Sequence, residues 1–113
     1  MTALDPGVLV AAGDLDVPLA PLPASEVVDG APRAGVVVLD DAGDVELGVW
    51  EMTPGTATDT EADEVFVVIA GRATVRCAGL PDLELAPGAV VRLRAGMRTT
   101  WVVHETLRKV YVA

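Results

Sequence analysis

Short valine-rich runs, separated by glycine and proline turns, fill most of this chain. It contains 20 valines and one isoleucine, and β-branched side chains of this kind favour strands over helices. From residue 34 onward the runs recur about every 8–12 residues, a spacing typical of a β-sandwich or barrel. No segment keeps a helical period over three turns. The sequence therefore predicts an all-β chain, and its 113 residues suffice for one domain.

The expected strands end at recognisable turns. We interpret Gly71 as the turn between two of them, and Pro87-Gly88 marks another. The expected strands span residues 34–39, 45–52, 64–70, 72–78, 83–86, 89–95, 99–105 and 107–112.

The first 33 residues differ in composition from the rest of the chain. They are rich in proline, alanine, aspartate and glycine, and prolines at positions 18, 21, 23 and 32 break any helix. We therefore predict an extended N-terminal arm over residues 1–33 and a barrel over residues 34–113. The arm drapes over the barrel, crosses to a partner chain or forms a partly ordered tail, and the sequence leaves these alternatives open.

The charge of the chain excludes two classes of partner. The formal net charge is −9, and residues 1–56 carry ten acidic side chains against one basic side chain. Nucleic acids and anionic membranes both require basic patches, so we expect neither as a partner. The apolar runs are far shorter than the roughly 20 residues that span a bilayer, and no targeting signal is expected at the start of the chain.

The single cysteine, Cys77, rules out a disulfide within the chain and indicates a reducing, cytoplasmic setting. It lies in a strand-like run, where a buried small apolar residue is the simplest interpretation. A nucleophilic role would require a histidine or lysine partner nearby in the sequence, and none is present.

Five short motifs follow one another in a fixed order. They are Trp50-Glu51-Met52-Thr53-Pro54-Gly55, then Glu64 and Gly71 with six residues between them, then Pro87-Gly88, then Gly96 and Trp101 with four residues between them, and last Arg108-Lys109-Val110-Tyr111. In order and spacing, residues 36–112 resemble a small single-domain cupin of the subgroup that includes the ureidoglycine aminohydrolase and ethanolamine-utilization cupins. The resemblance implies a cupin-type double-stranded β-helix, a jelly-roll barrel with a pocket at one mouth. It also implies a homodimer, in which the arm covers a sheet edge or exchanges between subunits.

The resemblance to cupins also has a consequence for metal binding. Metal-binding cupins present His-x-His, a glutamate after a gap of three or four residues, and a further histidine, which together hold one divalent ion. In this chain Glu64 occupies the glutamate position, and no histidine occupies the other three. Their counterparts are Thr58, Thr60 and Thr99, or Ala57, Asp59 and Thr99 with the longer gap. Because neutral hydroxyls are weak metal donors, we expect no metal and no other cofactor.

Other acidic and imidazole groups offer few metal ligands. The carboxylates of Asp59, Glu61, Asp63 and Glu64 form either a solvated loop or a site for a hard cation. His104 is the only histidine, and strand alternation directs it opposite to Thr99. We therefore expect it at the surface.

The pocket candidates combine one carboxylate with hydroxyls and aromatic rings. Glu64 acts as a general acid or base, or else serves only as a hydrogen-bonded structural carboxylate. Trp50 and Trp101 stack on a ligand or fill the barrel, and Tyr111 donates to a ligand or sits at the rim. The candidate ligand-binding residues are Trp50, Thr58, Thr60, Thr99, Trp101 and Tyr111.

Three functions follow from this reading. The first is a metal-free barrel that binds a small polar metabolite. The second is a small metabolic enzyme, an isomerase or aminohydrolase-like protein, with Glu64 as acid/base. The third is a structural or protein-interaction module with a filled barrel. A cavity of roughly 300 Å³ or more with Glu64 in its wall would favour the first two.

Overall fold

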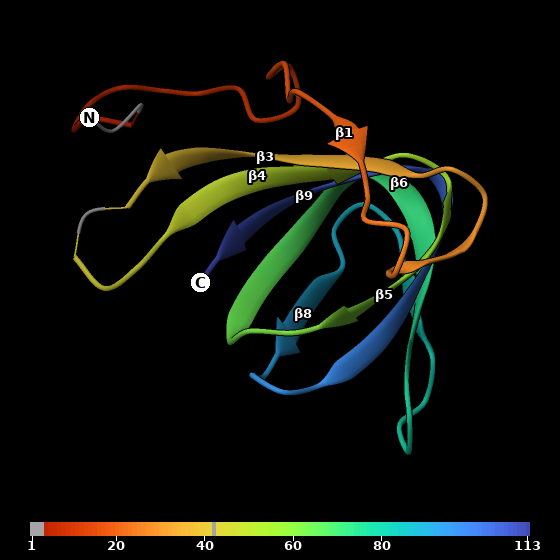
Figure 1. Ribbon diagram of the computed structural model, residues 1–113. Coiled ribbons are helices and arrows are strands. Elements are labelled where there is room, and N and C mark those ends of the chain that lie inside the picture. Colours follow the sequence, from red (N-terminus) through yellow and green to blue (C-terminus); the bar gives the residue numbers. More distant parts are fainter. Residues whose placement is uncertain (1–3, 42) are drawn as a thin grey trace.

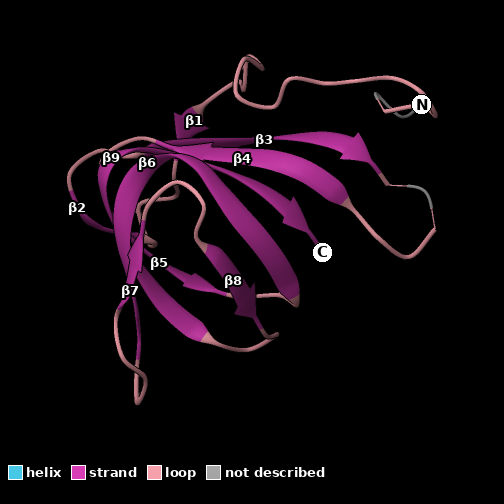
Figure 2. Cartoon of the chain, turned by 180° about the vertical axis from the view of Figure 1, so that it is seen from behind, coloured by secondary structure: helices cyan, strands magenta, loops and turns pink. Residues whose placement is uncertain are grey.

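The computed structural model describes residues 4–41 and 43–113, which form strands, turns and loops without a helix (Figures 1 and 2). The expected all-β architecture is confirmed. Within the described residues no helix could cross a membrane. The strands are β1 Ala20–Pro21, β2 Val27–Asp29, β3 Arg33–Asp40, β4 Leu47–Met52, β5 Gly55–Thr60, β6 Glu64–Cys77, β7 Leu83–Leu85, β8 Val90–Leu93 and β9 Arg98–Val112.

A curled antiparallel sheet encloses the barrel interior (Figure 1). Along one path the strand order is β1-β3-β4-β9-β5-β2, and β6 joins β9 to the short strands β7 and β8. The two long strands β6 and β9 connect the halves of the barrel. The second half of β9 pairs with β4 and the first half with β5, while β6 runs along the other side of β9.

The expected turn at Gly71 is wrong, because β6 continues through this residue as one strand. Gly71 has a φ of 84°, and the register between β6 and β9 shifts on both sides of it. A Cβ atom at this position would lie 2.0 Å from the carbonyl oxygen of Thr106. The glycine therefore allows two backbones to cross closely at a bulge, where a turn would have separated them. Likewise β9 is one strand, and β5 was not expected.

The bulge reverses which residues of β6 face the barrel interior. Phe66 and Val68 are buried before Gly71, at even positions, whereas Ala73 and Val75 are buried after it, at odd positions. An extra residue in one strand shifts the alternation of all later side chains to the other face. The bulge thus keeps apolar residues inside along a strand of 14 residues.

Two apolar clusters lie on opposite faces of the sheet. The larger cluster lies inside the barrel and includes Phe66, Leu93 and Leu107, each at most 1% exposed. The smaller cluster lies outside the barrel, where Val17 and other arm residues pack on Leu39 of β3 and on β4. The arm therefore covers one face of the barrel in this structure.

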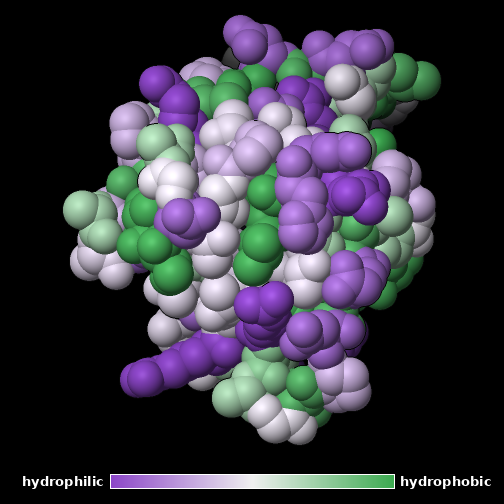
Figure 3. Space-filling model, turned by 90° about the vertical axis from the view of Figure 1, so that its right-hand side faces the viewer, coloured by the Kyte–Doolittle hydropathy of each residue, from purple (hydrophilic) through white to green (hydrophobic). Residues whose placement is uncertain are grey.

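The arm is also attached through its backbone. Strand β1 pairs with β3, β2 pairs with β5, and the Arg33 guanidinium donates to the carbonyl oxygen of Leu19 at 2.9 Å. Outside these contacts the surface is mixed. On the side shown in Figure 3, hydrophilic side chains alternate with small hydrophobic patches.

The close crossing at Gly71 gives a stability prediction. We expect Gly71→Ala to lower the free energy of unfolding by more than about 3 kcal/mol, since the new methyl group cannot fit against the backbone of β9. Gly79→Ala is the matched control, because Gly79 has a φ of 83° but no atom within 4 Å of its added Cβ. It should cost about 1–2 kcal/mol for the φ alone. Urea unfolding measures both, and equal losses would contradict the role given to the crossing.

Candidate functional site

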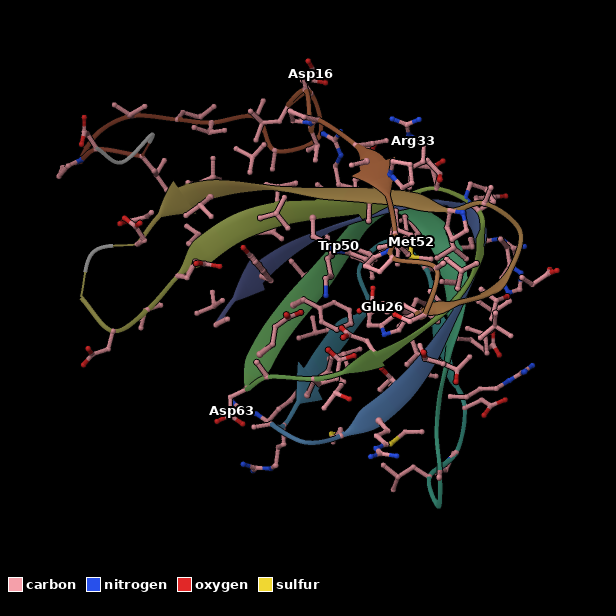
Figure 4. All side chains as sticks on the ribbon, in the orientation of Figure 1. Asp16, Glu26, Arg33, Trp50, Met52 and Asp63 are labelled. Carbon is pink, nitrogen blue, oxygen red and sulfur yellow. The ribbon has the colours of Figure 1, made fainter. Side chains whose placement is uncertain are left out.

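A cavity of about 300 Å³ opens inside the barrel between the arm and the long strands. Figure 4 shows Trp50 and Met52 extending from β4 toward it, and Glu26 of the arm at its edge. The lining combines residues from the arm and from five strands, with the segment after β5. They are Leu22, Glu26, Val36, Trp50, Met52, Ala57, Thr58, Asp59, Glu61, Glu64, Trp101, Lys109 and Tyr111.

A nearly buried ion pair lies in the wall of this cavity. The ammonium of Lys109 donates to Oε2 of Glu64 at 2.6 Å, and the two side chains are 6% and 15% exposed. Lys109 comes from β9 and Glu64 from the first residue of β6, so the pairing of these two strands brings them together. The pair places both a proton donor and a proton acceptor beside the cavity.

Three aromatic rings surround the same ammonium. Nζ of Lys109 lies 4.7 Å from the ring centroid of Trp50, 4.3 Å from that of Phe66 and 4.8 Å from that of Trp101. The rings also contact one another, with centroids 5.5 Å apart for Trp50–Trp101 and 5.8 Å for Phe66–Trp101. The negative faces of aromatic rings stabilise a cation, which offsets part of the cost of burying this charge.

A second polar cluster, formed by Glu61, Thr99 and Trp101, supports the first. The Thr99 hydroxyl donates to Oε2 of Glu61 at 2.5 Å, and the Trp101 indole donates to the same oxygen at 3.1 Å. Glu61 is 8% exposed and Thr99 is 2% exposed. These bonds fix the indole of Trp101 in the cavity wall.

The carboxylates of the cavity exceed its cations. Glu26, Asp59, Glu61 and Glu64 line it, with Lys109 as the one basic lining residue. Burial raises the pKa of Asp59, and the nearby charges of Glu61 and Glu26 raise it further. A backbone hydrogen bond at Thr60 and the charge of Lys109 act in the opposite direction. The cavity therefore favours neutral or cationic molecules over anions.

Tyr111 closes one side of the cavity. Its hydroxyl donates to Oε2 of Glu46 at 2.7 Å, and its ring lies against Gly48, where an added Cβ would be 2.5 Å from the hydroxyl oxygen. Burial of the phenol raises its pKa, and the hydrogen bond and charge of Glu46 raise it further. Tyr111 therefore keeps its hydroxyl proton, which it donates in the hydrogen bond to Glu46.

The structure brings together most of the residues predicted for the site. Trp50, Thr58, Glu64, Trp101 and Tyr111 all line the cavity. Two do not line it. Thr60, the last residue of β5, is exposed, and Thr99 is buried with its hydroxyl on Glu61.

The first of the two interpretations of the acidic segment, a solvated loop, is wrong for two of its four carboxylates. A solvated loop does not describe Glu61, which is buried, or Glu64, which is paired with Lys109. Asp63 accepts a hydrogen bond from the backbone N–H of Ala95 at 2.9 Å. Among residues 4–41 and 43–113, no group of three or more acidic, histidine or cysteine side chains is placed to hold a metal ion. His104 is exposed, as expected.

Sequence reasoning missed Lys109 and Glu61. The signal for Lys109 was present, because Leu107, Lys109 and Tyr111 alternate along β9 and all three are buried. A lysine between two inward-facing apolar residues belongs inside by this pattern, although lysines are seldom buried. Glu61 follows β5 and lines the cavity together with Ala57 and Asp59. The interior counterparts of His-x-His are therefore Ala57 and Asp59, the pair given by a gap of four residues before Glu64.

The donors at the family's metal position are few in this chain. The interior counterparts of His-x-His are Ala57, which has no donor atom, and Asp59. The counterpart of the later histidine, Thr99, donates its hydroxyl to Glu61. Glu64 is already bound by the Lys109 ammonium at 2.6 Å. This donor set does not fit a transition-metal ion, which requires imidazole or unengaged carboxylate ligands.

Comparison with protein families gives one match, to the EutQ-like cupin domain over residues 39–111. The chain belongs to the EutQ-like cupin family. The expected resemblance to ethanolamine-utilization cupins is thereby confirmed. No curated protein sequence matches the chain.

Solved structures share the cupin fold. The EutQ protein of Clostridium difficile is 19% identical, with a TM-score of 0.71 over 92% of this chain and 83% of that one. A protein of unknown function from Rhizobium leguminosarum bv. viciae 3841 is 27% identical, with a TM-score of 0.64 over 70% and 78%. A putative ethanolamine utilization protein Q from Salmonella typhimurium LT2 is 18% identical, with a TM-score of 0.61 over 89% and 97%.

The environment of Tyr111 predicts its titration. Tyr111 is the only tyrosine, so ultraviolet absorbance titration reports on it alone. We expect its midpoint in the folded protein to lie above the ordinary value of 10.0, and Glu46→Gln should bring it closer to that value. Because the folded-state pKa is raised, this group's contribution to stability is complete below pH 10.0 and declines as the pH rises above it. Circular dichroism confirms folding at each pH, and an ordinary midpoint would contradict the contact.

Proposed function

We propose that this cupin binds a small polar metabolite in the barrel cavity. The observation that carries the proposal is the cavity of about 300 Å³, which remains open although Trp50 and Trp101 both point into the barrel. Its size reaches the lower end of the range for small-molecule sites, and its wall combines aromatic faces with a few polar groups, as such sites do. A barrel filled by these tryptophans would instead have favoured the structural module.

An enzyme is the second candidate, and the pair of Glu64 and Lys109 supports it. Two titratable groups in direct contact beside a cavity could transfer a proton to or from a bound molecule. A buried ion pair is weak evidence of a role in folding stability, because apolar side chains of similar volume often stabilise a fold equally well or better. Its position in the cavity wall therefore favours a role in ligand binding or in catalysis by an isomerase or aminohydrolase-like protein.

We further propose that the site works without a metal and that the protein is a cytoplasmic homodimer. The engagement of Glu64 by Lys109 supports the first point. The single cysteine supports a reducing compartment. Val38, Val45 and Val112, each more than 40% exposed on or beside β3, β4 and β9, offer apolar surface to a second copy.

Ligand binding is tested by thermal denaturation with small neutral and cationic metabolites, such as polyols, amides and amino alcohols. A bound molecule at 100 times its Kd should stabilise the protein by about 2.7 kcal/mol. Ala57→Leu places a larger side chain in the cavity wall and should abolish this effect. Val90→Leu, at a residue 70% exposed on β8, adds bulk outside the cavity and should preserve it. Equal stabilisation of both variants would exclude the cavity as the site.

Glu64→Gln separates the two candidates. A binding protein should lose little affinity for a neutral ligand, whereas acid/base turnover should fall by a factor of about 10² or more. Turnover that Glu64→Gln leaves unchanged would show that Glu64 is not the acid/base group.

Native mass spectrometry of protein purified without a His tag or chelator tests the metal and the assembly together. We expect the mass of two chains with no bound transition metal, since the donors at the cupin position are engaged or absent. A stoichiometric metal would contradict the metal-free site, and a monomer at micromolar concentration would contradict the dimer.

A further inference from the structure

The chain has a single lysine, Lys109, and this residue lies inside the barrel. Lysine is among the residues that are almost never fully buried, yet Lys109 is only 5% exposed. The seven other basic residues are arginines, which cannot act as amine nucleophiles. The only side-chain amine of the protein therefore borders the proposed ligand cavity.

The surroundings of this amine combine a base with a dry, aromatic wall. Glu64 Oε2 lies 2.6 Å from Nζ, and the rings of Trp50, Phe66 and Trp101 lie within 4.8 Å of it. Because the Glu64 carboxylate and the Lys109 ammonium are in direct contact, the carboxylate can accept a proton from the ammonium without an intervening water molecule. A desolvated lysine of this kind is the usual amine nucleophile of proteins.

We propose that Lys109 captures a small neutral aldehyde or ketone as a protonated imine. The inference rests on the proposed function, because the carbonyl compound must occupy the same cavity. Glu64 first accepts a proton from the ammonium. The free amine then attacks the carbonyl carbon, a C–N bond forms, and the carbonyl oxygen takes the proton back from Glu64 to give a carbinolamine. Glu64 then takes a second proton from the nitrogen and passes it to the hydroxyl group, which the nitrogen lone pair expels as water.

The imine nitrogen keeps the last of the three ammonium protons, so the imine stays in the site as a cation. No oxidant or reductant takes part, and water is the only molecule released. The protonated imine keeps the charge of the ammonium it replaces, so Glu64 and the three rings stabilise it in the same way.

The charge of the cavity selects among carbonyl compounds. Glu26, Asp59 and Glu61 add negative charge beyond the Lys109–Glu64 pair. A 2-oxo acid such as pyruvate would bring its carboxylate against these groups, whereas an uncharged aldehyde would not. The site should therefore prefer a neutral carbonyl compound.

Reductive trapping tests the inference directly. The protein is incubated with propanal and cyanoborohydride, which reduces an imine to a stable secondary amine, and peptide mapping locates the added mass. Arg72→Lys provides an internal reference, since Arg72 is 60% exposed in a surface pair with Glu105. We expect Lys109 to be labelled at least about tenfold faster than the amine introduced at position 72. Labelling that is equal or slower would overturn the inference.

Two further variants define the mechanism. Lys109→Arg keeps a cation beside Glu64 and should abolish labelling at this position. Glu64→Gln removes the proton acceptor and should slow labelling by about tenfold or more, and thermal denaturation shows whether this variant folds. The comparison of labelling rates at Lys109 and at position 72 of Arg72→Lys does not require Glu64→Gln to fold. Propanal should also label Lys109 faster than pyruvate does, and the reverse order would contradict the charge argument.

The outcomes distinguish the inference from the function on which it rests. If propanal fails to label Lys109 while metabolites still stabilise the wild type and not Ala57→Leu, the imine is excluded and the binding function stands. If the metabolites also fail, the proposed function fails with it.

Discussion

The antiparallel pairing of β6 with β9 is the constraint on which the rest of this barrel depends. Strands of 14 and 15 residues would form a long twisted ribbon if they were regular throughout. The bulges around Gly71 bend them together, and the absent Cβ lets the two backbones meet beside Thr106. The same bulge keeps apolar residues inside on both sides of the bend. One glycine thus sets both the curvature of the sheet and the composition of its interior.

The bend also determines the chemistry of the cavity. Because β6 begins beside the last residues of β9, Glu64 and Lys109 meet at the barrel wall. Trp50 of β4 and Trp101 of the first half of β9 then close around the ammonium. A charge inside an apolar barrel is tolerated only when it is paired and hydrogen-bonded. The carboxylate and the rings meet that requirement while leaving open space beside the pair.

The arm contributes more than a cover. It packs Val17 against β3 and β4 on the outside, and it brings Leu22 and Glu26 to the edge of the cavity. The family match covers residues 39–111, so Leu22 and Glu26 lie outside the matched domain. Gly35 leaves room for the arm to lie against β3, because an added Cβ would be 1.9 Å from the carbonyl oxygen of Pro18. The arm therefore supplies part of the cavity wall that the matched domain does not.

The sequence by itself determined the all-β class, the cupin family, the exposed position of His104 and five of the residues that line the cavity. Turn residues and the alternation of apolar side chains are local properties, and the motifs keep a fixed spacing along the chain. The partners of each side chain were decided only by the tertiary structure. Lys109 and Glu64 are 45 residues apart, and Thr99 and Glu61 are 38 apart. Their contacts depend on the register of β9 against β6 and against β5, which no local pattern specifies. For the same reason Gly71 was taken for a turn: a positive φ suits either a turn or a bulge, and only the neighbouring strand distinguishes them.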